Sequence, residues 1–229
     1  MSWESSADYY RIINQDVRRR LGGAHSAKSL MLSVDFAQIE RLQHDGQWDR
    51  LAVMMCDAAC DLERGGAEIL VICTNTMHRM ADEVAAAVAI PLLHIADPTA
   101  EAIVAAGFGT VGLLGTAFTM EQAFYKDRLT DHYGLRVVTP EADDRQVVHE
   151  IIYRELVSGL IYPQSRDLYR HVIKRLVQRG AESIILGCTE IGILISQEDS
   201  TVPLFDTTKL HAHAAVDWAL GDATNQSAR

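Results

Sequence analysis

The sequence predicts an α/β protein built from two pseudo-symmetric lobes, each a parallel sheet flanked by helices. Short apolar runs alternate with stretches of helical periodicity along the chain, which is typical of parallel strands joined by crossover helices. An internal repeat indicates that this arrangement occurs twice. The 229 residues are 48% hydrophobic and 23% charged, near the average for globular proteins, and are enough to bury a sizeable core.

The repeat consists of two segments with the same order of features. Residues 66–75 read Gly-Ala-Glu-Ile-Leu-Val-Ile-Cys-Thr-Asn, and residues 180–190 read Gly-Ala-Glu-Ser-Ile-Ile-Leu-Gly-Cys-Thr-Glu. Downstream, Ile-Pro-Leu-Leu at 90–93 matches Val-Pro-Leu-Phe at 202–205. Each half therefore combines a turn, a buried strand, a Cys-Thr pair and an x-Pro-Leu strand, which predicts two similar lobes that face one another.

The individual elements follow from apolar periodicity and from turn residues. The expected helices span residues 4–21, 47–64, 77–88, 98–106 and 119–133, two stretches within 143–179, a short segment after Cys188, and 208–220. The expected strands span residues 28–34, 68–72, 91–94, 110–114, 135–138, 183–187 and 202–205. Thr119 with Gln122 three residues later predicts a capping box, and the polar tail 222–229 is expected to be loose.

The two halves differ at their beginning. The second half opens with the strand 110–114 and the turn Gly115-Thr116, whereas the first half opens directly at Met1 with a helix. A strand of comparable type is therefore expected ahead of Met1, in which case the natural reading frame starts further upstream. The alternative is that this chain lacks one strand of its first sheet.

Charge and motifs narrow the function classes. The balance of 21 Lys and Arg against 31 Asp and Glu gives a net charge of −10, which argues against nucleic-acid binding. No apolar run approaches the roughly 18 residues of a membrane-spanning helix and no signal segment is present, so we expect a cytoplasmic protein without membrane contact. No glycine-rich phosphate loop and no metal-ligand spacing of histidines occurs, so neither a nucleotide nor a metal is expected.

Cys73 and Cys188 are the candidate catalytic residues. Each ends a buried strand, where ligands bind in open α/β sheets, and each precedes a predicted helix. A helix N-terminus favours a carboxylate and lowers a thiol pKa from about 8.5 toward neutrality. Two such thiols facing one cleft would form an acid/base pair, in which one removes a proton from one face of a carbon and the other delivers a proton to the opposite face.

Polar residues beside the two cysteines are candidates for holding a substrate. They are Thr74, Asn75 and Thr76 after the first cysteine, and Thr189 and Glu190 after the second. Thr116, in the Gly115-Thr116-x-x-Thr119 turn, either holds a carboxylate or phosphate or simply caps the next helix.

Other cysteines and histidines have plainer interpretations. A lone cysteine at a strand end is more often core packing, but recurrence of the Cys-Thr pair in both halves favours chemistry for Cys73 and Cys188. Cys56 and Cys60 lie four apart on the helix 47–64 and are expected to pack against a neighbouring helix or a partner subunit. His78 could enter the cleft, although a capping or partly exposed position is the more common case for such a residue.

Four segments of the chain resemble one known family. Cys-Thr-Asn-Thr-Met-His at 73–78, Gly-Cys-Thr-Glu-Ile at 187–191, Met-Ser-Trp-Glu-Ser at 1–5 and Gly-Leu-Leu-Gly-Thr at 112–116 resemble the aspartate/glutamate racemase family. The likeness is greatest to its bacterial broad-specificity amino-acid racemases. It implies a cofactor-independent racemase with two catalytic cysteines, an active site in the cleft between two lobes, an amino-acid substrate and usually a homodimer.

The resemblance also implies boundaries and contacts. The last helix would return to the first lobe, which gives a first lobe of residues 1–97 with 207–229 and a second of 98–206. Substrate contacts are implied for Met1, for Gln43 and for the groups after each cysteine. Family members normally carry a strand and Gly-Gly before the Met-Ser-Trp segment, which favours an upstream start.

Several alternatives remain open. A related isomerase, decarboxylase or hydantoin racemase would use the same fold and thiols, and a catalytically silent amino-acid-binding protein would keep the lobes without turnover. Pyridoxal phosphate is not expected, because it needs a Schiff-base lysine in a phosphate site and no lysine lies in either Cys-Thr segment. The lysines of the chain are Lys28, Lys126, Lys174 and Lys209.

Overall fold

The computed structural model describes residues 1–226, and the chain divides into two compact units. The first unit contains Met1–Cys73, Met77–His94 and the chain from Ala212 onward, and the second contains Thr74–Thr76 and Ile95–His211. The last helix continues to Gln226, so the tail expected to be loose is helical over 222–226, and its residues 227–229 lie outside the described part. No helix of the described chain combines the length and apolarity needed to cross a bilayer.

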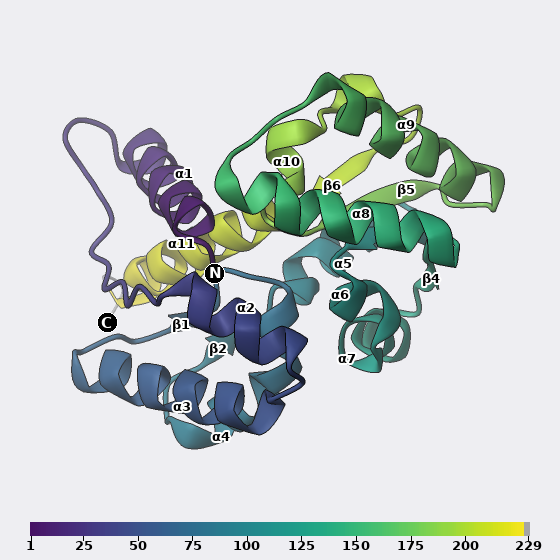
Figure 1. Ribbon diagram of the computed structural model, residues 1–229. Coiled ribbons are helices and arrows are strands. Elements are labelled where there is room, and N and C mark those ends of the chain that lie inside the picture. Colours follow the sequence, from purple (N-terminus) through teal and green to yellow (C-terminus); the bar gives the residue numbers. More distant parts are fainter. Residues whose placement is uncertain (227–229) are drawn as a thin grey trace. The chain divides into compact units, whose positions relative to one another are not determined.

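The first unit surrounds a short parallel sheet with helices (Figure 1). Strands β1 (Leu70–Val71) and β2 (Leu92–Leu93) pair with Leu70 opposite Leu92. The helical elements that lie wholly or mainly in this unit are α1 (Trp3–Leu21), α2 (Phe36–His44), α3 (Trp48–Arg64), the 3-10 helix η1 (Thr76–Met80), α4 (Ala81–Ala87) and α11 (Thr207–Gln226). Buried apolar side chains of α2, α3, η1 and α4 form a core with those of β1.

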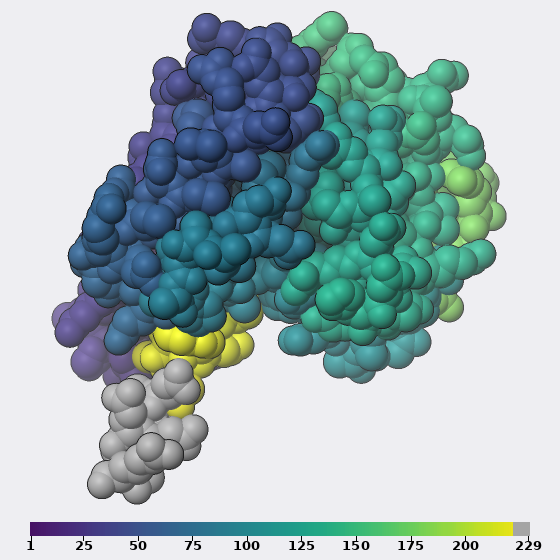
Figure 2. Space-filling view, turned by 90° about the horizontal axis from the view of Figure 1, so that it is seen from below, coloured from purple at the N-terminus to yellow at the C-terminus, as the bar shows by residue number. Residues whose placement is uncertain are grey.

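Helices α1 and α11 are joined by a buried carboxylate. Tyr9 and Ile12 of α1 pack with Ala212 of α11, and Figure 2 shows α11, in yellow, against purple and blue segments of the same unit. The Asp16 side chain is 1% exposed and accepts hydrogen bonds from Arg19, from Arg20 and, at 2.9 Å, from Nδ1 of His213. Burial alone would raise the pKa of Asp16, but the hydrogen bonds from Arg20, His213 and Arg19 outweigh it and hold this pKa well below its ordinary value.

We expect Asp16→Asn to destabilise the protein by about 2 kcal/mol at neutral pH, because charge-assisted hydrogen bonds to a buried carboxylate are lost. The ionised carboxylate stabilises the fold above its ordinary pKa of 3.8, and this contribution is lost as the pH falls toward the lowered folded-state pKa. The difference between wild type and variant should therefore shrink below about pH 4. Urea unfolding at pH 7 and pH 3 measures this difference in the free energy of unfolding. Asp8→Asn is the matched control, because Asp8 forms a half-exposed ion pair with Arg11. An equal loss from both variants would contradict the assignment.

The second unit contains a four-stranded parallel sheet with the order β4-β3-β5-β6. Its strands are β3 (Thr110–Gly115), β4 (Arg136–Val138), β5 (Ser183–Gly187) and β6 (Leu204–Asp206). Its helices are α5 (Ala96–Ala105), α6 (Ala117–Glu121), α7 (Ala123–Asp127), the π-helical turn η2 (Arg128–His132), α8 (Ala142–Arg154), η3 (Leu156–Ser158), α9 (Pro163–Gln178), α10 (Ile191–Leu194) and η4 (Gln197–Asp199). Helices α5, α6, α8 and α9 pack against this sheet, and β3 and β5 are almost entirely buried (Figure 1).

The internal repeat is confirmed in both units. Gly66 and Gly180 end the helix before the buried strand with φ of 93° and 95°, a left-handed conformation that favours glycine. The strands that follow have the same register, because Leu70 donates its backbone N–H to Pro91 and Ile184 donates to Pro203, each at 2.9 Å. The α/β class, the parallel strands and the repeated lobe are thus as the sequence predicts.

One expectation about the first unit is wrong, and one of its helices is missing from the predicted elements. Residues 28–34 form no strand, because no described strand pairs with them and an isolated strand leaves its backbone groups unpaired. The apolar side chains of Leu30, Met31 and Leu32 are exposed. Helix α2 was not predicted. Asp35 caps it by accepting the N–H of Ala37 at 3.1 Å, and its buried residues Ile39, Leu42 and Gln43 face the core.

Two expectations about the second unit are also wrong. The predicted helix 119–133 is broken into α6, α7 and η2, with Gln122 in an extended conformation between the first two. The N-cap is Thr116 and not Thr119, since the Thr116 hydroxyl accepts the N–H of Thr119 at 3.3 Å. The cap therefore lies directly after β3, at the end of the sheet where ligands bind in such folds.

Candidate active site

The carboxyl edge of the second sheet carries three polar residues, each at the end of a strand. Gly115 of β3 lies opposite Gly187 of β5, so Thr116 and Cys188 follow the two strands at the same level. Thr207 follows β6, and its hydroxyl donates to the carbonyl of Leu186 at 2.9 Å. In open parallel sheets this edge is where ligands bind.

The two glycines allow this close approach. A Cβ on Gly115 would lie 2.7 Å from the carbonyl oxygen of Gly187, and one on Gly187 would lie 2.8 Å from that of Leu114. Both obstacles are backbone atoms, which cannot rotate away. The sequence thus carries Gly-Thr and Gly-Cys at these strand ends because any larger residue before Thr116 or Cys188 would push β3 and β5 apart.

A cluster of three buried hydroxyls lies beside this edge. Thr76 Oγ1 is 3.0 Å from Thr116 Oγ1 and 3.4 Å from Thr119 Oγ1, and the last two are 3.3 Å apart. Asn75 Nδ2 donates to Thr207 Oγ1 at 3.0 Å, whereas its Oδ1 is buried with no hydrogen-bond partner. Asn75, Thr76 and Thr116, which come from two distant parts of the sequence, are therefore brought into one polar cluster.

Cys188, Thr189 and Glu190 form a second group at the end of β5. The Cys188 thiol donates to Glu190 Oε2 at 3.1 Å, and the Thr189 hydroxyl donates to the same oxygen at 2.6 Å. Burial raises the pKa of the Cys188 thiol well above its ordinary value, and the charge and the acceptor oxygen of Glu190 raise it further. A backbone N–H of Glu190 that points at the sulfur opposes this shift.

Cys73 lies two residues after Val71, the last residue of β1 in the first unit. Its carbonyl accepts the Met1 nitrogen at 2.8 Å and the Ser5 hydroxyl at 2.9 Å, which fixes the chain around it. Its side chain packs with Tyr9, Ile12 and Ala212. Burial raises the pKa of the Cys73 thiol to about 11, against a smaller lowering by the charge at the Met1 nitrogen.

The expectation that a helix N-terminus lowers the two thiol pKa values is wrong. Both values are raised, and burial is the largest cause in each case. The helix after Cys188 is only the four residues of α10, and Cys73 is followed by the 3-10 helix η1, so neither thiol meets a long helix dipole.

Of the remaining predicted residues, Gln43 and His78 lie in the first unit and Thr74 belongs to the second. Gln43 is buried and its Nε2 donates to the sulfur of Met77 at 3.2 Å. His78 is buried, not partly exposed, and its ring meets that of His94 edge-on at 4.5 Å between centroids. Cys60 Sγ contacts the carbonyl of Ala87 at 3.5 Å, which confirms packing of this cysteine against a neighbouring helix region.

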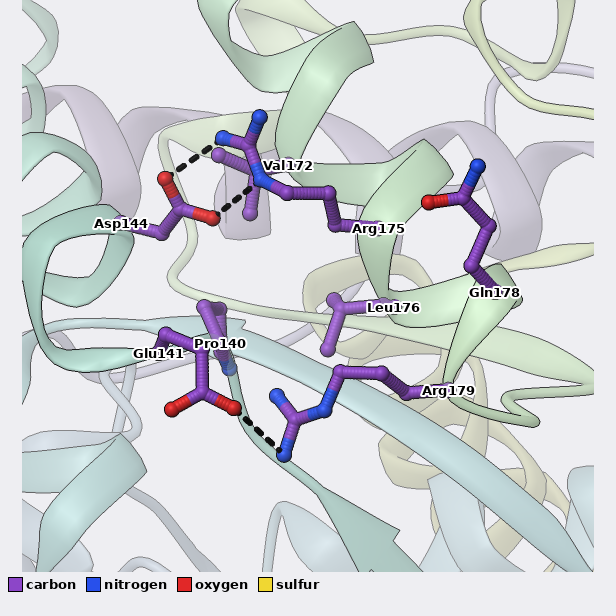
Figure 3. Close-up of a pocket in the computed structure, with 8 residues that line it drawn as sticks. All are labelled: Pro140, Glu141, Asp144, Val172, Arg175, Leu176, Gln178 and Arg179. Atoms are coloured by element: carbon purple, nitrogen blue, oxygen red, sulfur yellow. Dashed lines mark hydrogen bonds and ion pairs between the residues drawn. The ribbon is translucent and has the colours of Figure 1, made fainter.

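A shallow depression of about 230 Å³ lies elsewhere in the second unit, between α8 and α9 (Figure 3). Arg175 is held there by Asp144 at 2.5 and 2.6 Å, and Arg179 pairs with Glu141 at 3.1 Å. None of the predicted site residues lines it, and its two arginines are occupied by carboxylates. Among the described residues no group of three or more His, Cys, Asp or Glu is placed to hold a metal ion.

Thr119 and Thr207 belong to the polar cluster but were not predicted. Thr207 follows an x-Pro-Leu strand, so the rule that ligands gather at carboxyl ends of parallel strands could have identified it. The sequence pattern predicts Thr119 as the N-cap of a helix, and an N-cap hydroxyl is not expected to contact a distant residue such as Thr76.

Comparisons with known proteins agree with the α/β fold of the chain. The sequence model of the family described as Asp/Glu/Hydantoin racemase matches residues 1–215. A solved structure described as a candidate Asp/Glu racemase from Yersinia pestis is 54% identical with a TM-score of 0.89 and 96% coverage of each chain. An aspartate racemase homologue from Pyrococcus horikoshii OT3 is 32% identical with a TM-score of 0.80 and 94% coverage of each chain.

Among curated proteins, the broad specificity amino-acid racemase RacX of Bacillus subtilis (strain 168) is 23% identical over 175 residues, which are 73% of this chain and 72% of RacX. Residues 1–215, which the family's sequence model matches, include both Cys-Thr pairs of this chain. Because the family's sequence model covers nearly the whole chain, this protein belongs to the Asp/Glu/hydantoin racemase family.

Proposed function

We propose that this amino-acid racemase inverts the α-carbon of a free amino acid with two thiols, Cys73 and Cys188, and without pyridoxal phosphate. The α-proton of an amino acid is only weakly acidic, so its removal must be coupled to stabilisation of the negative charge that develops on the carboxylate. A thiolate on one face removes the proton, and a thiol on the other face delivers one. The proposal requires that one bound substrate meets both sulfur atoms.

The polar clusters supply the rest of the proposed chemistry. Hydrogen-bond donors aimed at the substrate carboxylate would stabilise the enediolate-like charge as it forms. We propose Thr76, Thr116 and Thr189 as hydroxyl donors and Asn75 as an amide ligand. Met1, Gln43, Thr74 and Glu190 complete the proposed set of substrate-site residues.

A single observation carries the proposal. The Cys-Thr pair follows a parallel strand in each unit, β1 in the first and β5 in the second. Both strands have the same register with an x-Pro-Leu strand. Cys73 lies three residues after Leu70 and Cys188 four residues after Ile184, and a cysteine kept for core packing needs no such counterpart near the end of a second strand. We further propose that the two units correspond to lobes of residues 1–97 with 207–229 and of 98–206, and that the enzyme is a cytoplasmic homodimer.

Incubation of the purified enzyme with pure enantiomers should yield the racemic mixture of at least one amino acid. The panel includes aspartate, glutamate, neutral and basic amino acids, and chiral chromatography measures both enantiomers over time. Hydantoins and dicarboxylic acids without an amino group are assayed in parallel, because a decarboxylase, isomerase or hydantoin racemase would act on these. The proposal would be abandoned if an amino acid bound tightly while its optical rotation stayed constant for hours.

A further inference from the structure

We infer that Glu190 is a positioning residue that keeps the resting proton on the sulfur of Cys188, so that Cys188 waits as the acid of the pair. This inference rests on the proposed function in one respect, namely that Cys188 is one of the two catalytic thiols. In this inference Glu190 acts on the protonation of the Cys188 thiol, whereas the proposed function only places Glu190 among the residues that contact the substrate.

The geometry supports a proton held between these two groups. Cys188 is 9% exposed and Glu190 is 4% exposed, so water competes little for their hydrogen bond. The thiol donates to Glu190 Oε2 at 3.1 Å, and the Thr189 hydroxyl donates to the same oxygen at 2.6 Å. Two donors on one oxygen fix the carboxylate in place, and an ionised carboxylate next to the sulfur disfavours a second negative charge there.

Other titratable groups of the second unit do not supply this effect. Tyr169 of α9 interacts with both Cys188 and Glu190, but burial raises its pKa, so it stays neutral in the working range. Glu155 lies beside Tyr169 and accepts the Ser165 hydroxyl at 2.6 Å. Asp206, which adjoins Gly192 of α10, is paired with Lys209 at 2.9 Å. Of these carboxylates only Glu190 touches the sulfur in a hydrogen bond.

The proton transfer balances without another reactant. When Cys188 acts as the acid, its S–H proton passes to the α-carbon, whose electron pair forms the new C–H bond, and the S–H electron pair stays on sulfur as a thiolate. Glu190 disfavours that thiolate, so the enzyme returns to the resting form by regaining a proton at Cys188 and losing one at Cys73. Among the forms of the free enzyme that carry one thiolate, the form with the thiolate at Cys73 and the proton on Cys188 is therefore the more populated.

This inequality has a kinetic consequence that the equilibrium constant restricts. Because a racemisation has an equilibrium constant of 1, kcat/KM must be the same from both enantiomers at every pH. The unequal population of the protonation forms can therefore appear only in kcat and KM taken separately. The resting form, with its thiolate at Cys73, favours reaction of the enantiomer whose α-proton faces Cys73. Glu190→Gln should bring the two kcat values closer together.

Alkylation of the full-length enzyme tests the inference directly. Iodoacetamide is added at a series of pH values, and mass spectrometry of the digested protein gives the rate for each cysteine. Since the thiolate is the reacting form, Glu190→Gln should raise the Cys188 rate at pH 8 about tenfold or more, because the negative charge is removed while a hydrogen-bond acceptor remains. Cys56 and Cys60 serve as internal references whose rates should not change.

Two control variants make the result decisive. Glu190→Asp, which restores the charge, should return the Cys188 rate toward that of the wild type, and Glu198→Gln, at an exposed glutamate of the same unit, should leave it unchanged. An unchanged or lower rate at Cys188 in Glu190→Gln would overturn the inference even if racemisation is intact. A raised rate in a protein that racemises nothing would uphold the role of Glu190 while refuting the proposed function.

If Glu190→Gln does not fold, the wild type alone still decides. The alkylation rate of Cys188 should then level off at a higher pH than the alkylation rate of Cys73. Burial acts on both thiols, but the Glu190 carboxylate contacts only the Cys188 thiol. Levelling at an equal or lower pH would overturn the inference.

Discussion

Replacing either Cys73 or Cys188 by alanine is expected to lower the rate of racemisation from both enantiomers by about 10³-fold or more. Each turnover needs one sulfur as base and the other as acid. The double variant should be no less active than either single variant, because residues that act as a unit are not additive. Progress of chiral conversion from pure L and pure D substrate measures the loss. Cys60→Ser, whose hydroxyl can keep the contact with Ala87, is the matched control and should retain activity.

The same variants should separate the two half-reactions. The thiol that remains in each single variant can still remove and return the α-proton of the one enantiomer that it meets, without inversion. In D₂O, Cys73→Ala and Cys188→Ala should therefore incorporate deuterium into opposite enantiomers, which proton NMR detects as loss of the α-proton signal. If either single variant racemised at a near-normal rate, its missing cysteine would belong to the packing of the core and the two-thiol mechanism would be refuted.

The sequence predicts the architecture well wherever one segment carries its own signal. The repeat around Gly66 and Gly180 is a string of neighbouring residues, and its turn, strand and Cys-Thr pair follow from local rules that tertiary contacts do not change. The same holds for β3 and β5, whose continuous apolar runs leave no other place for them than the core. By contrast, residues 28–34 have the composition of a strand, but a strand exists only where a partner completes its hydrogen bonds.

The site is predicted less completely because its contacts join distant parts of the chain. Thr76 meets Thr116 across 40 residues and Asn75 meets Thr207 across 132, and no local pattern records either pairing. The sign of the thiol pKa shifts also escaped prediction. A helix N-terminus can be expected from the sequence, but the burial that outweighs it can be seen only in the folded unit. Asp16 is another example, since its partner His213 lies 197 residues away.

Among substitutions that add a single methyl group at the carboxyl edge of the second sheet, Gly115→Ala is expected to cause the largest loss of stability. The added Cβ would lie 2.7 Å from the carbonyl oxygen of Gly187 and 3.2 Å from Cβ of Thr119. The first contact is with backbone of the paired strand, so only separation of β3 from β5 relieves it. We expect a cost of about 3 kcal/mol, or a melting temperature lower by roughly 6–12 °C.

The substitution should also impair the site, because Thr116 and Cys188 directly follow the two glycines that would be forced apart. Circular dichroism during heating measures the stability, and the racemisation assay at a temperature where the variant is still folded measures the activity. Gly109→Ala is the matched control, since its Cβ would meet only the Glu182 carboxylate at 3.9 Å, an ordinary contact. A Gly115→Ala protein that melts and turns over like Gly109→Ala would show that the two strand ends are less tightly apposed than the paired glycines indicate.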